Sequence, residues 1–249
     1  MRNHWSPLLL LGLLSLASPN HASEPLATIP FVGCPADGQA GPLAPPKGAP
    51  RHLPIPANVA AQLAYYQANQ GRGVLGPRGW FCFETYGSGG GSLILTPAPH
   101  NSSYFFSDHL QSLAGPAIEY NGMEGGTSGR FDVALVAARV FPHFRWFVKK
   151  VIAEDVEPAS DFHFGPFPAD RLTYKSDHLV EFVTPSNSVG LGTQSWLAKG
   201  PGDITGFAWI GGEDTDVMLL SMRLPPALAS LGPIIIQQAK GEIAATNPH

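Results

Sequence analysis

Charged residues are scarce in this 249-residue chain: Asp, Glu, Lys and Arg together make up 14% of it, and the formal net charge is -4. A protein that binds nucleic acid uses a surplus of Lys and Arg against the phosphates, so we expect no nucleic-acid partner. Long apolar runs are also missing beyond the first 22 residues. Spanning a bilayer takes about 20 apolar residues, so we expect no transmembrane segment once those residues are removed.

Several motifs that identify enzymes are absent. The chain contains neither the GxSxG nucleophile motif nor the HExxH zinc motif, and its histidines are scattered. The glycine-rich stretch 87–91 continues into Ser92 and Leu93 without the lysine of a phosphate-binding loop, and is more typical of a hairpin turn. We therefore expect no cofactor and no metal, and the catalytic residues of any enzyme activity stay unknown.

Cysteine occurs twice, as Cys34 and Cys82. In an oxidising compartment two cysteines most economically form one structural disulfide, which we predict here. Two buried free thiols, or a metal site with partners the sequence does not identify, are the alternatives.

The first 22 residues have the three parts of a secretory signal peptide. A short basic start precedes the apolar run Leu8–Leu16, and small and polar residues follow up to Ala22. This pattern predicts cleavage after Ala22 and a secreted or periplasmic protein, the alternative being an uncleaved anchor.

Proline (25) and glycine (28) are abundant, which indicates short elements joined by many turns. Nine prolines fall in residues 23–56, which we predict to be an extended, irregular arm. We interpret residues 57–249 as a single domain, with any division into smaller units expected near 158–170.

Residue patterns predict both helices and strands. The expected helices cover 56–70, 129–154 with a break at Pro142, and 233–244, and the expected strands cover 80–86, 92–96, 117–120, 172–175, 178–184, 204–210 and 216–224. Strands that follow one another without intervening helices favour an antiparallel sheet. The predicted fold class is therefore α+β, a mainly antiparallel sheet with three or four helices packed on it and many loops.

Two segments are candidate binding surfaces. Basic residues cluster in the second half of the helix predicted after Gly129, and aromatic residues cluster in 162–167. The candidate residues are Arg145, Lys149, Lys150, Phe162, His163 and Phe164. The basic face could bind an anionic partner or could simply be solvated beside a helix C-terminus. The aromatic segment could line a pocket or could be a loop fixed to the core by its rings.

Five stretches carry a resemblance to known sequences: FVGCPADGQAGPL (31–43), GWFCFETYGSGG (79–90), GRFDVALVAARVFP (129–142), VEFVTPSNSVGLGTQSWL (180–197) and LLSMRLPPAL (219–228). In these stretches the chain resembles uncharacterised secreted bacterial proteins with no assigned function. The resemblance implies a bacterial exported protein and brings no activity, cofactor or site residue with it.

We expect an exported, non-enzymatic binding or accessory module of the cell envelope, whose partner is an anionic envelope component or another protein. The alternative is a secreted hydrolase whose site is assembled from dispersed Ser, His and Asp residues, with His163 or His178 among them. A purely structural envelope protein is a third option.

Overall fold

The computed structural model describes residues 26–106, 112–194 and 196–246. The predicted signal peptide, residues 1–22, lies outside these ranges. The strands are β1 Ala27–Ile29, β2 Phe31–Gly33, β3 Ala36–Gly38, β4 Arg51–Leu53, β5 Leu63–Gln67, β6 Val74–Pro77, β7 Phe81–Gly87, β8 Gly90–Thr96, β9 Ala117–Met123, β10 Arg171–Ser176, β11 Leu179–Thr184, β12 Ile204–Gly211 and β13 Asp216–Arg223. The α-helices are α1 Ala57–Ala60, α2 Ser102–Phe105, α3 Arg130–Val140, α4 Arg145–Ile152 and α5 Gly232–Thr246, and the 3-10 helices are η1 Pro142–Phe144, η2 Ala159–Asp161, η3 Leu191–Thr193 and η4 Pro226–Leu231.

An eight-stranded sheet forms the centre of the molecule, in the order β10-β11-β12-β13-β9-β8-β7-β3. All its neighbouring strands are antiparallel except the edge pair β3 and β7, which is parallel. A second sheet, β2-β5-β6, and the two-stranded sheet β1-β4 are smaller. The predicted fold class, a mainly antiparallel α+β fold, is confirmed at this level.

The helix count differs from the prediction of three or four. Five α-helices occur among the described residues, and two of them, α1 and α2, are four-residue turns. Within the same ranges, no helix combines the length and the apolar character needed to cross a membrane.

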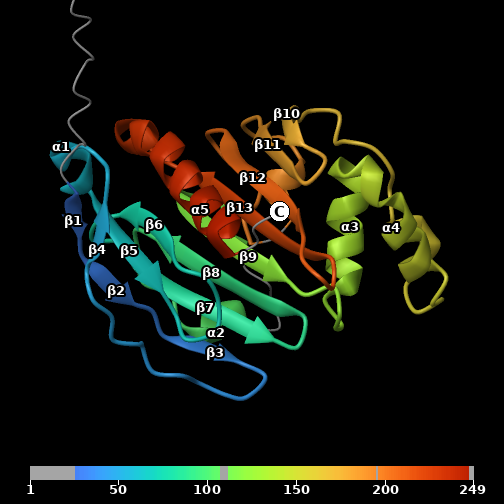
Figure 1. The fold of residues 1–249 in the computed structure, drawn as a ribbon, viewed down its shortest axis with the longest axis horizontal. Coiled ribbons are helices and arrows are strands. Elements are labelled where there is room, and N and C mark those ends of the chain that lie inside the picture. Colours follow the sequence, from blue (N-terminus) through green and yellow to red (C-terminus); the bar gives the residue numbers. More distant parts are fainter. Residues whose placement is uncertain (1–25, 107–111, 195, 247–249) are drawn as a thin grey trace, which may run out of the picture.

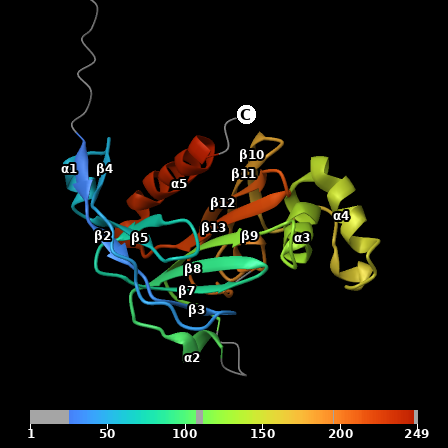
Figure 2. The ribbon, with the colours of Figure 1, turned by 60° about the horizontal axis from the view of Figure 1, so that its bottom comes forward.

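Each face of the large sheet is covered by a different layer. Figures 1 and 2 show α3 next to the large sheet and α4 on the far side of α3. Residues of α3 and α4 belong to one core, and residues of α5 and of the β2-β5-β6 sheet belong to the other. Alternation along β9 separates the two cores: Ala117 belongs to the core under α3, whereas Ile118 and Tyr120 belong to the core under α5. Residues that line the α5 side of the sheet therefore come from alternate positions on several strands.

The described part of the proline-rich arm, residues 26–56, contains four three-residue strands joined by irregular segments. It supplies β1 to β4, and it joins two sheets, because β2 pairs with β5 and β3 pairs with β7. Cys34 lies at the crossing between β2 and β3 and forms the predicted disulfide with Cys82 on β7, with the two Cα atoms 5.3 Å apart. The disulfide thus ties the arm to the edge of the large sheet.

The helix predicted over 56–70 is wrong beyond its first turn. The helix α1 ends at Ala60, and the chain continues as β5 between β2 and β6. Tyr65 and Tyr66 are neighbours in β5 and both are buried, so both faces of this strand are packed. Burial between two layers overrides a helical pattern in the sequence, because aromatic residues also suit a strand.

Most other element predictions are confirmed. The glycine-rich stretch forms the β7–β8 hairpin turn, where Gly90 has a φ of 129° that side-chain-bearing residues rarely adopt. Pro142 separates α3 from α4, because proline lacks the N–H that a continuous helix needs. The strand predicted at 117–120 is longer than expected, since β9 continues to Met123 in the middle of the sheet.

Candidate functional site

The first candidate surface is the outer face of α4, which we call the α4 patch. Its members are Arg145, Trp146, Lys149 and Lys150, all exposed. The opposite face of the helix packs inward through Phe147, Val148 and Val151. Residues four apart lie side by side on a helix, so Arg145 neighbours Lys149 and Trp146 neighbours Lys150. The large indole of Trp146, 56% exposed, therefore lies among three basic side chains.

Other basic residues of this region are engaged inside the fold. Arg130 forms an ion pair of 2.7 Å with Glu154, and the guanidinium of Arg139 lies 4.0 Å from the ring centre of Phe167. By contrast, the basic side chains of the α4 patch form no ion pair within the described part of the chain. Their charges are available to a partner.

The aromatic segment divides between core and surface. Phe162 is buried in the core under α3, so it anchors the loop rather than lining an open pocket. His163 is exposed, and Phe164 is 43% exposed with the guanidinium of Arg145 5.2 Å from its ring centre. The structure thus brings Phe164 to the α4 patch and separates Phe162 from it.

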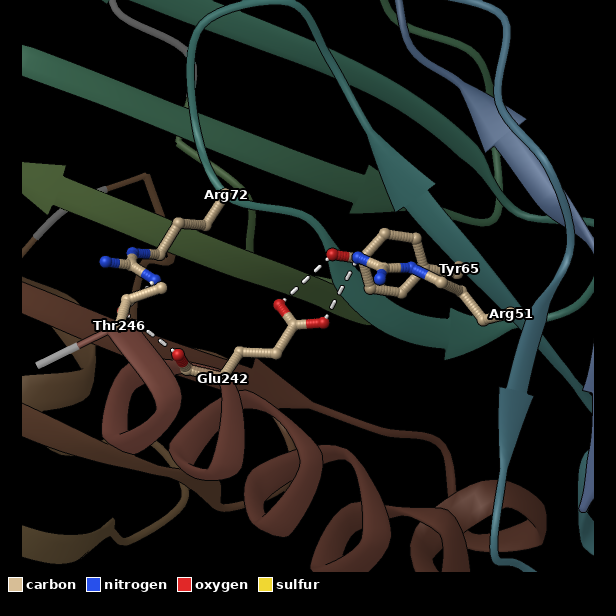
Figure 3. Close-up of polar contacts among 5 residues, drawn as sticks. All are labelled: Arg51, Tyr65, Arg72, Glu242 and Thr246. Atoms are coloured by element: carbon tan, nitrogen blue, oxygen red, sulfur yellow. Dashed lines mark hydrogen bonds and ion pairs between the residues drawn. The ribbon is translucent and has the colours of Figure 1, made fainter. Parts of the chain in front are cut away.

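A second candidate site lies where α5 meets the small sheet (Figure 3). The carboxylate of Glu242 accepts a hydrogen bond of 3.1 Å from the Tyr65 hydroxyl and one of 3.4 Å from Arg51, whose guanidinium lies 4.2 Å from the centre of the Tyr65 ring. Arg72, in the loop between β5 and β6, donates a hydrogen bond of 2.9 Å to the hydroxyl of Thr246. No local sequence signal indicates this cluster, because even the directly bonded Arg51 and Glu242 are 191 positions apart.

Burial controls the titration of this cluster. Burial raises the pKa of the Glu242 carboxyl, against the opposing effects of the Tyr65 hydrogen bond and the two arginines. Burial, followed by the charge of Glu242, raises the pKa of Tyr65 to about 12. Tyr65 is therefore a protonated donor at neutral pH, and the cluster joins α5 to the small sheet.

A hollow of about 480 Å³ lies beside Arg72, and we call it the Arg72 hollow. Its lining comes from the β5–β6 loop, from the ends of β7, β8, β9 and β13, and from Thr246 of α5. Glu84, buried below the loop, accepts a hydrogen bond of 3.2 Å from the backbone N–H of Gln70, which holds the loop that carries Arg72. Burial raises the pKa of the Glu84 carboxyl.

A further cavity, of about 1070 Å³, lies between the β10–β12 end of the sheet and the segment from η4 to α5. Prolines and aliphatic side chains make up much of its wall, and its charged groups have partners. Arg171 pairs with Asp203 at 3.1 Å, while Glu181 is bonded by both Lys175 and Lys240. Burial alone would raise the pKa of Glu181, but the hydrogen bonds from these lysines outweigh it and lower that pKa. This cavity is an apolar groove with neutralised charges.

The hydrolase alternative considered His163 and His178. His163 is exposed, and the Nδ1 atom of His178 lies 2.8 Å from the carbonyl oxygen of Ile210, to which it donates. In the parts of the chain that the structure covers, no three His, Cys, Asp or Glu side chains are grouped closely enough to hold a metal ion.

Comparison with known proteins gives no identity for this chain: no protein-family model, no curated protein and no solved structure matches it. Its function must therefore be argued from its own geometry.

Proposed function

We propose that this protein is an exported, non-enzymatic binding module of the bacterial cell envelope, which docks on anionic lipid through the α4 patch. The observation that carries the proposal is the exposed indole of Trp146 among three basic side chains that lack ion pairs in the described structure. Tryptophan favours the boundary between water and lipid, and Lys and Arg favour anionic headgroups. The exposed ring of Phe164 extends the same surface.

Export is supported by two features. The Cys34–Cys82 disulfide suits an oxidising compartment, and residues 1–22 have the pattern of a signal peptide. The net charge of -4 opposes non-specific adsorption, so binding depends on the local charge of the patch.

Charge reversal tests the proposal. Each basic residue near an anionic surface contributes about 1 kcal/mol, so Arg145→Glu combined with Lys149→Glu is expected to weaken binding at least about thirtyfold. Sedimentation with vesicles of phosphatidylglycerol, and with neutral phosphatidylcholine vesicles for comparison, measures this change. Both side chains are exposed and form no ion pair with any residue that the structure describes, so folding is expected to stay intact.

The matched control makes the same charge change elsewhere. Lys47 and Lys199 are exposed and lie outside the α4 patch, and the variant Lys47→Glu with Lys199→Glu is expected to bind nearly as the wild type does. If both double variants lose binding equally, overall charge is responsible and the patch is not the docking site. Binding to neutral vesicles as tight as to anionic ones would also refute the proposal.

A further inference from the structure

The floor of the Arg72 hollow is a patch of bare backbone. Gly91 pairs with Gly122 on the same face of the sheet as Tyr120, while the neighbouring pair Gly87 and Gly90 belongs to the opposite face, because side chains alternate along a strand. A Cβ atom added at Gly122 would meet the side chain of Met218 at 3.3 Å, in the tight range of contacts. With no side chain at Gly91 and Gly122, the end of the Met218 side chain is the group that a ligand backbone would contact on this face.

One end of the hollow carries the positive charge of Arg72 and the hydroxyl of Tyr120. Arg72 is half-buried, and it forms no ion pair with any described residue. Tyr120 also lines the hollow and is 3% exposed, and its hydroxyl has no hydrogen-bond partner within the described structure. A buried hydroxyl without a partner is costly, which favours a ligand that accepts its hydrogen bond.

The other end is acidic. Tyr120, Gly122 and Glu124 are two residues apart along β9 and its end, so they follow one face of the sheet. At the rise of a strand, Glu124 lies roughly 13 Å from Tyr120. Asp216, at the start of β13, lines the same end and accepts a hydrogen bond of 3.0 Å from the backbone of Gly125. Neither carboxylate is paired with Lys or Arg in the described ranges.

We infer that the Arg72 hollow binds a short peptide of small residues, with its C-terminal carboxylate at Arg72 and its amino group at Asp216. A guanidinium holds a carboxylate through two parallel hydrogen bonds, and the Tyr120 hydroxyl supplies another donor. An extended peptide covers about 3.4 Å per residue, so three residues, with a hydrogen bond at each end, are comparable in length with the roughly 13 Å along β9 from Tyr120 to Glu124. The volume of about 480 Å³ is in the range of small-molecule sites. This site is distinct from the α4 patch and does not depend on it.

Triglycine is the probe, since it carries both charges and no side chain. Isothermal titration of the full chain with triglycine, triglycine amide and N-acetyltriglycine separates the two ends. Removal of either peptide charge is expected to weaken binding about tenfold or more. Arg72→Gln is expected to weaken the binding of triglycine by a similar factor. In this variant triglycine and triglycine amide are expected to bind equally.

Arg51→Gln is the matched control, because Arg51 belongs to the neighbouring cluster, where it is bonded to Glu242, but does not line the hollow. This variant is expected to bind triglycine as the wild type does. Tyr120→Phe removes an oxygen that has no partner in the described structure, so it keeps the fold and is expected to weaken binding severalfold. If Arg72→Gln does not fold, the Tyr120→Phe variant tests the inference in its place.

Several results would overturn the inference. They are the absence of triglycine binding to the folded wild type, equal binding of triglycine and its amide, and equal losses in Arg51→Gln and Arg72→Gln. Inorganic phosphate that binds as tightly as triglycine and is unaffected by Asp216→Asn would show a simple anion site, which also contradicts a peptide site.

Discussion

Loss of the Cys34–Cys82 disulfide should destabilise the protein through its unfolded state. The bond closes a loop of 48 residues between the arm and β7. In the chain-entropy description, such a loop stabilises the native state by about 4 kcal/mol. For a chain of this size that corresponds to a fall in melting temperature of about 10 °C in Cys82→Ser. The native structure loses little else, because Cys82 is half-buried on an edge-proximal strand.

Thermal unfolding followed by circular dichroism, with and without a reducing agent, measures this effect. Without reductant the variant should melt about 10 °C below the wild type, and with reductant the two should melt close together. The reduced wild type is the internal control. Equal melting temperatures without reductant would show that the bond is absent or contributes nothing to stability, and the calculation would fail.

Two further predictions concern buried charges. Arg223 is 2% exposed and donates to the carbonyl oxygens of Leu113, Gly115, Ala198 and Gly202, so Arg223→Met should lower the free energy of unfolding by about 3 kcal/mol or more in urea denaturation. A loss below about 1 kcal/mol would contradict its role as a clamp between these loops. Because burial raises the folded-state pKa of Glu84, its protonated form is favoured in the native state, and stability falls as pH rises from the unfolded pKa of about 4 through the folded one. Glu84→Gln should therefore gain stability relative to the wild type between pH 4 and pH 7, and a pH-independent difference would refute this.

Local signals in the sequence predict much of the fold. The β7–β8 hairpin depends on neighbouring glycines, and the break between α3 and α4 depends on Pro142. Tertiary burial explains the failures. The chain at Tyr65 forms a strand because layers cover both of its faces, and β9 extends to Met123 because it lies in the middle of the sheet.

The two candidate sites differ in how far the sequence alone can predict them. The α4 patch comes from one helix, so its basic residues can be found from their spacing, although the exposure of Trp146 cannot. The Arg72 hollow unites Arg72, from the β5–β6 loop of the small sheet, with Tyr120 and Asp216, whose strands β9 and β13 are neighbours in the large sheet. A pattern within one segment cannot reveal such a site.

Contact between Trp146 and lipid is the most direct test of the proposed docking. Brominated phosphatidylglycerol vesicles quench the fluorescence of a tryptophan that reaches the bilayer boundary, and comparison with Trp146→Phe isolates this residue from the others in the chain. We predict quenching in the wild type that weakens as salt rises and is absent in Trp146→Phe. Vesicle binding without quenching of Trp146, or equal quenching in its absence, would contradict docking through the α4 patch.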